Sequence, residues 1–85
     1  MSIENIVNTN ILNVYPNPAK QVITIKGKHV SQVKVLNNSG KVVKILSLQD
    51  ATNPIIQLGG LPSGVYHLQI QTVNGKMSET NFVKE

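Results

Sequence analysis

The sequence predicts an all-β fold, and three features of its 85 residues support this prediction. Apolar and polar residues alternate with a period of two along most of the chain, as they do in strands that bury one face. Clusters rich in Asn, Gly, Pro and Ser interrupt the alternation at roughly eight-to-twelve-residue intervals, which is typical of short strands joined by turns. No eleven-residue window keeps apolar residues at the three-and-four spacing of a helix without a Gly, Pro or Asn cluster, so no helix of useful length is expected.

The turn clusters place seven expected strands along the chain. Within one of them, Val33 and Val35 should share a buried face and Lys34 should lie on the other. The expected strands are residues 11–15, 21–26, 32–37, 41–48, 55–58, 65–72 and 76–84. Short antiparallel strands at this spacing are typical of an immunoglobulin-like or fibronectin-type β-sandwich, with a small barrel as the alternative.

Each connection carries its own turn signal. Pro16 and Pro18 force a turn because neither can donate a hydrogen bond to a sheet. A tight hairpin is expected at residues 37–40 and a loop at residues 49–54. Asn74-Gly75 predicts a second hairpin with a type I′ turn. The apolar anchors expected in the returning strand are Met77, Phe82 and Val83.

The stretch LPSGVY, from Leu61 to Tyr66, has the layout of a tyrosine corner. In such a corner the Tyr hydroxyl forms a hydrogen bond with a backbone group a few residues upstream and fixes the connection between the two sheets. Gly64 would supply a backbone conformation that a residue with a Cβ reaches only with strain. The sequence therefore predicts that Leu61, Gly64 and Tyr66 serve the fold.

The composition indicates one small domain, residues 11–85, preceded by a polar, Asn-rich linker or disordered segment, residues 1–10. The net charge of +4 comes from eight scattered Lys residues without any Arg. Because nucleic-acid readers depend on Arg forks or stacked aromatic residues, this pattern indicates a solvated surface and no nucleic-acid partner. There is no Cys for a disulfide, and no apolar run is long enough to span a membrane.

Catalytic and metal-binding patterns are missing from the sequence. His29 is expected in a loop and His67 on a polar strand face, and no nucleophile elbow accompanies them. None of the acidic residues has the spacing of a metal site with another candidate ligand. These residues are Glu4, Asp50, Glu79 and Glu85. We therefore expect a domain that is not an enzyme and holds neither a cofactor nor a metal.

Three blocks of the sequence carry a resemblance to a known family. They are VYPNPAKQVITI (residues 14–25), VKVLNNSGKVV (residues 33–43) and LPSGVYHLQIQTVNGKMSETNFVK (residues 61–84). In this order and spacing, the blocks resemble the type A C-terminal sorting domain of the type IX (Por) secretion system of Bacteroidetes. The resemblance covers nearly the whole chain, from Ile11 onward.

The resemblance assigns two sets of residues. Those that match the family's opening block, its Gly-basic pair and its Leu-x-x-Gly-x-Tyr block are expected to build the fold: Tyr15, Pro16, Asn17, Pro18, Gly40, Lys41, Leu61, Gly64 and Tyr66. Those that match the last Gly-basic pair and the apolar-apolar-basic ending are expected to act in recognition: Gly75, Lys76, Phe82, Val83 and Lys84. Lys41 departs mildly from the family, which commonly has Arg there.

The resemblance implies that the domain is a secretion signal. It would direct an N-terminal cargo, which this chain lacks, through the periplasm and across the outer membrane to the cell surface or medium. Its implied partners are an outer-membrane translocon and a sortase-like protease that removes the domain. Weak self-association through exposed strand edges stays open.

Two other classes of function stay open at this point. A carbohydrate-binding or adhesive sandwich module of a secreted enzyme would offer exposed aromatic platforms, whereas the three aromatic residues here are expected in the core or in turns. A passive spacer would tolerate a tag on its last strand.

Overall fold

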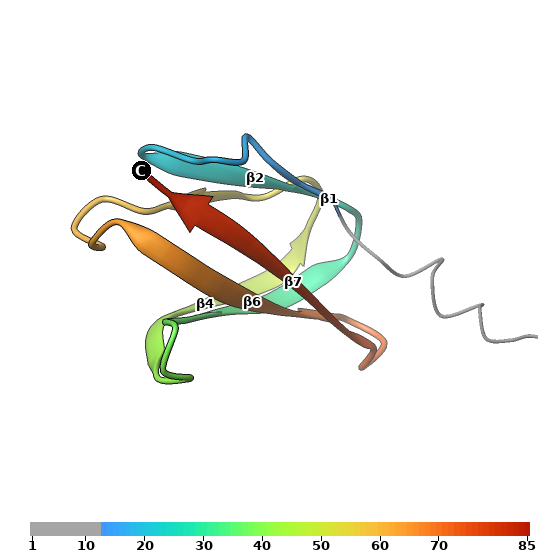
Figure 1. Ribbon diagram of the computed structural model, residues 1–85. Helices are drawn as coiled ribbons and strands as arrows, with labels where there is room; N and C mark the ends of the chain where they lie inside the picture. The colour runs from blue at the N-terminus through green and yellow to red at the C-terminus, as the bar shows by residue number, and fades with distance from the viewer. Residues whose placement is uncertain (1–12) are drawn as a thin grey trace, which may run out of the picture.

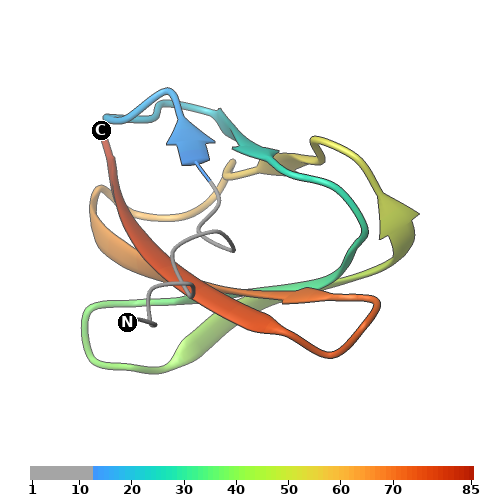
Figure 2. The ribbon, with the colours of Figure 1, turned by 90° about the vertical axis from the view of Figure 1, so that its right-hand side faces the viewer.

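The computed structural model describes residues 13–85, which form two antiparallel sheets packed face to face (Figures 1 and 2). The strands are β1 (Asn13–Tyr15), β2 (Val22–Lys26), β3 (Val30–Leu36), β4 (Val42–Ala51), β5 (Ile55–Gln57), β6 (Gly64–Thr72) and β7 (Met77–Lys84). The expected immunoglobulin-like β-sandwich of seven strands is confirmed. The expected linker, residues 1–10, lies outside the described residues, as do residues 11 and 12 of the first expected strand.

The two sheets divide the strands three against four. One sheet has the order β1-β2-β5 and the other has the order β4-β3-β6-β7, with every neighbouring pair antiparallel. Figure 2 looks along the sandwich and shows the two sheets as separate layers. The edge strands are therefore β1 and β5 in the smaller sheet and β4 and β7 in the larger one.

The core lies between the layers and is built from the inward side of the alternating pattern. Val33 and Val35 are fully buried and the intervening Lys34 is only half-buried on the opposite face, as the alternation predicts. The buried apolar residues are Ala19, Ile23, Ile25, Val30, Val33, Val35, Ile56, Leu58, Tyr66, Leu68, Ile70 and Phe82. No buried residue of the described chain is polar or charged, so burial of apolar surface stabilises this core without buried ion pairs.

One predicted loop is partly wrong. Residues 49–51 continue β4, because Ala51 still pairs with Val30 of β3, and the turn begins only after it. Asn53 then makes the connection: its backbone N–H donates to the carbonyl of Gly27 (2.7 Å), and its Oδ1 accepts the N–H of Gly27 (2.9 Å). A positive φ of 51° at Asn53 suits the tolerance of Asn for left-handed backbone.

The predicted apolar anchors of β7 are only partly correct. Phe82 is buried, but Met77 and Val83 are 52% and 41% exposed. Met77 and Val83 are both an odd number of residues from Phe82, so the alternation along β7 places them on the outer face of the sheet.

Candidate recognition site

The C-terminal end of β7 is held by the turn between β1 and β2. Val83 donates its backbone N–H to Oδ1 of Asn17 (3.0 Å), across 66 residues of sequence. The carbonyl of Val83 accepts the N–H of Ala19 (2.7 Å), and Glu85 donates its N–H to the carbonyl of Ala19 (2.8 Å). Figure 1 accordingly shows the C-terminus beside the start of β2. The opening and terminal blocks of the sequence therefore form one structural unit, which we call the clamp (Asn17, Ala19, Val83 and Glu85).

The tyrosine corner lies next to the clamp. The hydroxyl of Tyr66 donates to the carbonyl of Pro62 at 2.5 Å, which confirms the predicted corner. Its ring stacks on Phe82 with a centroid distance of 5.5 Å and an interplanar angle of 17°. Gly64, which pairs with Lys84 of β7, has a φ of 155°, a conformation that side chains with a Cβ rarely adopt. These residues join the corner to the last strand.

The other end of β7 begins at the hairpin of residues 72–76. Gly75 donates its N–H to the carbonyl of Thr72 (2.9 Å), and Thr72 donates its N–H to the carbonyl of Lys76 (2.9 Å). Gly75 has a φ of 89°, while Asn74 is not among the described residues with positive φ. The predicted type I′ turn is therefore wrong, because that turn needs positive φ at both central residues. A turn followed by one left-handed Gly closes the hairpin instead.

The hairpin of residues 37–41 has the same construction. Gly40 has a φ of 87° and donates its N–H to the carbonyl of Asn37 (2.9 Å). Asn37 donates its N–H to the carbonyl of Lys41 (2.8 Å). In both hairpins the Gly supplies the left-handed backbone and the Lys that follows closes the turn through its main chain. Neither Lys side chain is required for the turn.

The structure separates the residues expected to act in recognition. Gly75 and the exposed Lys76 lie at the start of β7, whereas Phe82, Val83 and Lys84 lie at its end. At the rise of a strand, the backbones of Lys76 and Lys84 are about 25 Å apart. Phe82 is 1% exposed and Lys84 is half-buried, so of the terminal block Val83 is the most accessible side chain.

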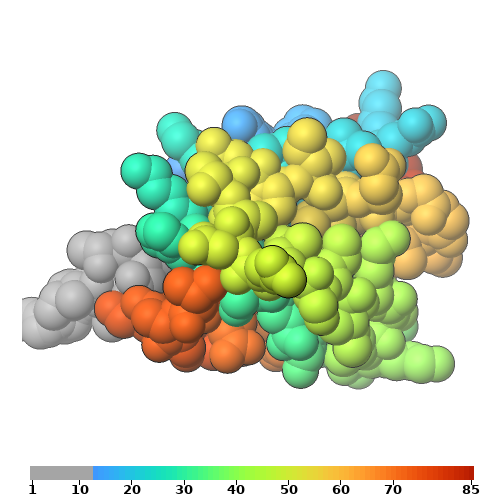
Figure 3. Space-filling view, turned by 180° about the vertical axis from the view of Figure 1, so that it is seen from behind, coloured from blue at the N-terminus to red at the C-terminus, as the bar shows by residue number. Residues whose placement is uncertain are grey.

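The two ends of the sandwich can be compared in Figure 3. Seen from behind, the 37–41 hairpin and the corner before β6 lie at one end, and the 72–76 hairpin lies at the other. A shallow hollow of about 430 Å³ lies at the first end, between residues 37–43 and 61–66. Its lining includes Val43, Leu61 and Val65 together with hydroxyl and amide groups of the hairpin.

The outer face of β6 and β7 carries polar cross-strand pairs. Nδ1 of His67 lies 2.6 Å from Oδ1 of Asn81, and Nε2 of Gln69 donates to Oε2 of Glu79 at 3.4 Å. His67 is thus on the polar face, as predicted, with an amide as its neighbour. These contacts are typical of a solvated sheet face and form no catalytic arrangement.

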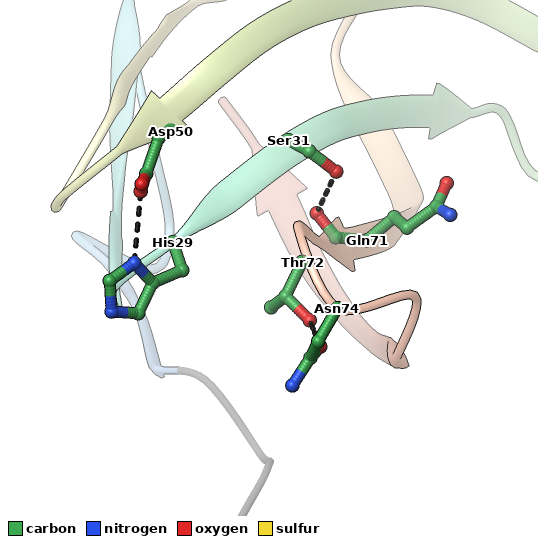
Figure 4. Close-up of polar contacts among 6 residues, drawn as sticks. All are labelled: His29, Ser31, Asp50, Gln71, Thr72 and Asn74. Carbon is green, nitrogen blue, oxygen red and sulfur yellow. Dashed lines mark hydrogen bonds and ion pairs between the residues drawn. The ribbon is translucent and has the colours of Figure 1, made fainter.

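Further polar contacts lie near the hairpin of residues 72–76 (Figure 4). Nδ1 of His29 is 3.0 Å from Oδ1 of Asp50, and both side chains are more than half exposed, at 64% and 56%. Ser31 donates its hydroxyl to the carbonyl of Gln71 at 3.0 Å. Residues 13–85 contain no group of three His, Cys, Asp or Glu side chains that could hold a metal ion. Nor does any helix in this part of the chain have the length and apolarity to cross a membrane.

Two features of the site were missed in the sequence. Ala19 is completely buried and bridges to Lys84, although it looked like part of a plain turn. Asn17 accepts a hydrogen bond from the last strand, although it looked like a turn former. An Asn fixed between two Pro residues, followed by a small apolar residue, was the available signal, but its partner 66 residues away could not be read from local sequence.

Together, these features define an immunoglobulin-like domain. Most residues of its sequence motifs stabilise the fold, and a few of their side chains, such as Lys76 and Val83, are exposed. The sequence profile of the Secretion system C-terminal sorting domain, the domain of the Por secretion system, matches residues 13–84. The chain belongs to this family. It is a non-catalytic C-terminal sorting domain of the type IX system, a secretion signal for the export of a cargo protein. Membership implies an attached cargo, interaction with the type IX machinery and secretion across the outer membrane.

Two further comparisons add little to this assignment. No curated protein matches the chain by sequence. Among solved structures, the chain is similar to CopC from Methylosinus trichosporium OB3b, with 14% sequence identity and a TM-score of 0.49. This similarity covers 86% of the chain and 90% of CopC.

Proposed function

We propose that the folded sandwich is recognised in the periplasm by an outer-membrane translocon through Lys76. After the domain has crossed the outer membrane, a sortase-like protease removes it at the surface, and the cargo is released or joined to lipopolysaccharide. Val83 and Lys84 form a second, weaker contact at the far end of β7. Gly75 and Phe82 act through the fold, by shaping the hairpin and filling the core.

The observation that carries this proposal is that the backbone of Lys76 closes the hairpin, while its side chain makes no contribution to the turn. Its carbonyl accepts the hydrogen bond that closes the hairpin (2.9 Å), and its N–H donates to Oδ1 of Asn74 at 3.3 Å. Its side chain is exposed, and its ammonium group makes no hydrogen bond or ion pair with the residues that the structure describes. An exposed, unpaired charge contributes little to folding. The Lys76 side chain therefore has little role in the stability of the fold, and recognition by a partner would account for it.

The hairpin also fixes the backbone that carries this charge. Thr72 and Asn74 bond to each other and to the hairpin backbone, and Val73 donates its N–H to the carbonyl of His29 at 2.8 Å. An ammonium group carried on a short, hydrogen-bonded turn suits an acidic site on a partner, because no backbone freedom of the turn has to be lost on binding.

An export assay tests the proposal. The full chain is fused behind a periplasm-directed fluorescent protein in a bacterium that has the type IX system, and fluorescence is measured in the periplasm, on the surface and in the medium. We expect the wild-type fusion to be exported and Lys76→Gln to reduce export by about tenfold or more, the effect of losing one charge pair of at least about 1.4 kcal/mol.

Lys41→Gln is the matched control, because Lys41 follows the left-handed Gly of the equivalent hairpin and is also exposed. We expect it to be exported like the wild type. Retention of the wild-type fusion in the periplasm would contradict the function, and equal export of both variants would contradict the role of Lys76. Deletion of residues 82–85 is a poorer test, because it removes the buried Phe82 and the clamp together.

A further inference from the structure

Of the four strand edges that the structure describes, three are short or protected. β1 and β5 are edge strands of three residues each. β4 is long, but its register with β3 shifts at two places. In addition, Lys44 lies opposite Val35, on the side of the sheet that faces the core. Bulges and inward-facing charges on an edge strand are known devices against pairing with another chain.

The fourth edge, β7, has none of these protections over most of its length. It pairs with β6 through eight consecutive positions without a register shift, from Met77 to Lys84. It contains no Pro, and its inward-facing positions before the clamp are Ser78, Thr80 and Phe82, none of which is charged. A long, regular and unguarded edge is a template for a further strand.

The clamp shows which backbone groups face outward. The N–H and carbonyl of Val83 bond to Asn17 and Ala19 rather than to β6, so they point away from the sheet. Because backbone groups alternate along a strand, the N–H and carbonyl groups of Met77, Glu79 and Asn81 point the same way. The clamp occupies the edge from Val83 onward, and none of the described residues bonds to the outward backbone groups of Met77, Glu79 and Asn81.

We propose that the outward-facing backbone groups of Met77, Glu79 and Asn81 on the edge of β7 dock an extended segment of a partner protein as an added antiparallel strand with a Lys or Arg opposite Glu79. Placing that segment in the secretion machinery rests on the proposed function. Strand addition would use backbone hydrogen bonds that any cargo-bearing domain with this β7 register could supply, whereas the side chain at position 79 would set the register.

The charge of Glu79 favours a foreign strand over a second copy of the domain. Its carboxylate makes one weak contact, the 3.4 Å hydrogen bond from Gln69, and it is the only acid in β7. Two copies paired about the middle of residues 77–81 would place Glu79 opposite Glu79, and like charges directly opposite each other are destabilising. A basic residue at that position would be stabilising instead.

A Pro at position 79 tests docking at the edge of β7 separately from folding of the domain. Glu79→Pro removes an outward N–H that β6 does not use, and edge strands tolerate Pro at such positions. We expect the fusion carrying Glu79→Pro to melt as a folded domain and to be exported about tenfold less or worse, since a backbone hydrogen bond is lost and the ring obstructs the added strand. Glu79→Gln keeps the N–H and removes only the charge, so it should reduce export by about threefold.

The outcomes are distinguishable from failure of the proposed function. A wild-type fusion that stays in the periplasm refutes the function, whereas wild-type export with equal export of folded Glu79→Pro refutes edge docking alone. If the isolated domain forms a dimer in sedimentation and Glu79→Pro abolishes it, the edge binds a second copy and the proposed partner is overturned.

If Glu79→Pro does not fold, photocrosslinking from benzoylphenylalanine at position 79 replaces it as the test. It should crosslink a machinery protein, while the same group at Ile45, in the same row of the sheet, should not. Equal crosslinking would overturn the proposal.

Discussion

The two ends of β7 are held by different kinds of contact. At the C-terminal end, Val83 and Glu85 bond to a turn that lies 66 residues earlier in the sequence, and Phe82 stacks on the tyrosine corner. At the other end, the hairpin is closed by hydrogen bonds among residues 72–76, with one further bond from Val73 to His29. The first end joins three distant parts of the chain, while the second is mostly local.

This difference gives physical meaning to the family's sequence blocks. The opening block, the corner block and the terminal block all meet at the C-terminal end of β7. There, hydrogen bonds join the opening block to the last strand, and the ring of Tyr66 stacks on Phe82. A residue there can be required in every family member because the fold needs it. The Gly-Lys pair at the hairpin end is different, because the Gly satisfies the turn and leaves the Lys side chain available to a partner.

The largest expected contrast is between two apolar residues of the same strand. Phe82→Ala should lower the free energy of unfolding by about 3–5 kcal/mol, because it opens a cavity beside Tyr66. Met77→Ala, at the exposed hairpin end, should change it by less than about 0.5 kcal/mol. Urea unfolding followed by circular dichroism measures both. Similar losses for the two variants would show that the hairpin end is as tightly packed as the other.

A smaller effect is expected at the corner itself. Tyr66→Phe keeps the ring that stacks on Phe82 and removes only the hydroxyl that donates to Pro62. The free energy of unfolding should fall by about 0.5–1.5 kcal/mol, the net contribution of one hydrogen bond. Export at a temperature well below the melting point should be unchanged, because the residue serves the fold. An unchanged melting temperature would count against the corner as a source of stability.

The sequence was sufficient for the fold because its signals are local. Alternation along residues 65–72 and the Pro and Gly positions marked the strands and turns, and the LPSGVY stretch predicted the Tyr66 corner. The errors also have local causes. Residues 49–51 look like a loop but remain paired because Val30 of β3 reaches Ala51, and the second hairpin uses one left-handed residue where Asn74-Gly75 suggested two.

The site was less predictable because it depends on contacts across the chain. Alternation placed Phe82 in the core. No residue near Val83 in the sequence indicated that the outward N–H of Val83 would bond to Asn17. Likewise, Gly75 and Lys76 were expected to act in recognition together with the terminal block, although a whole strand separates the two motifs. Register and sheet order determine these relations, and both follow from packing of the complete domain.

The finest comparison uses one Asn at each end. Asn17→Ala removes the acceptor for the N–H of Val83 and should lower the free energy of unfolding by about 1 kcal/mol, the net contribution of one of the three hydrogen bonds in the clamp. Asn74→Ala removes a 3.3 Å bond to the N–H of Lys76, within a turn that the left-handed Gly75 still closes, so the loss should stay below about 0.5 kcal/mol. Amide hydrogen exchange locates the effects: Asn17→Ala should speed exchange only at the clamp amides, those of Ala19, Val83 and Glu85. Equal losses from the two substitutions, or faster exchange spread along β7, would mean that the two ends are not held independently.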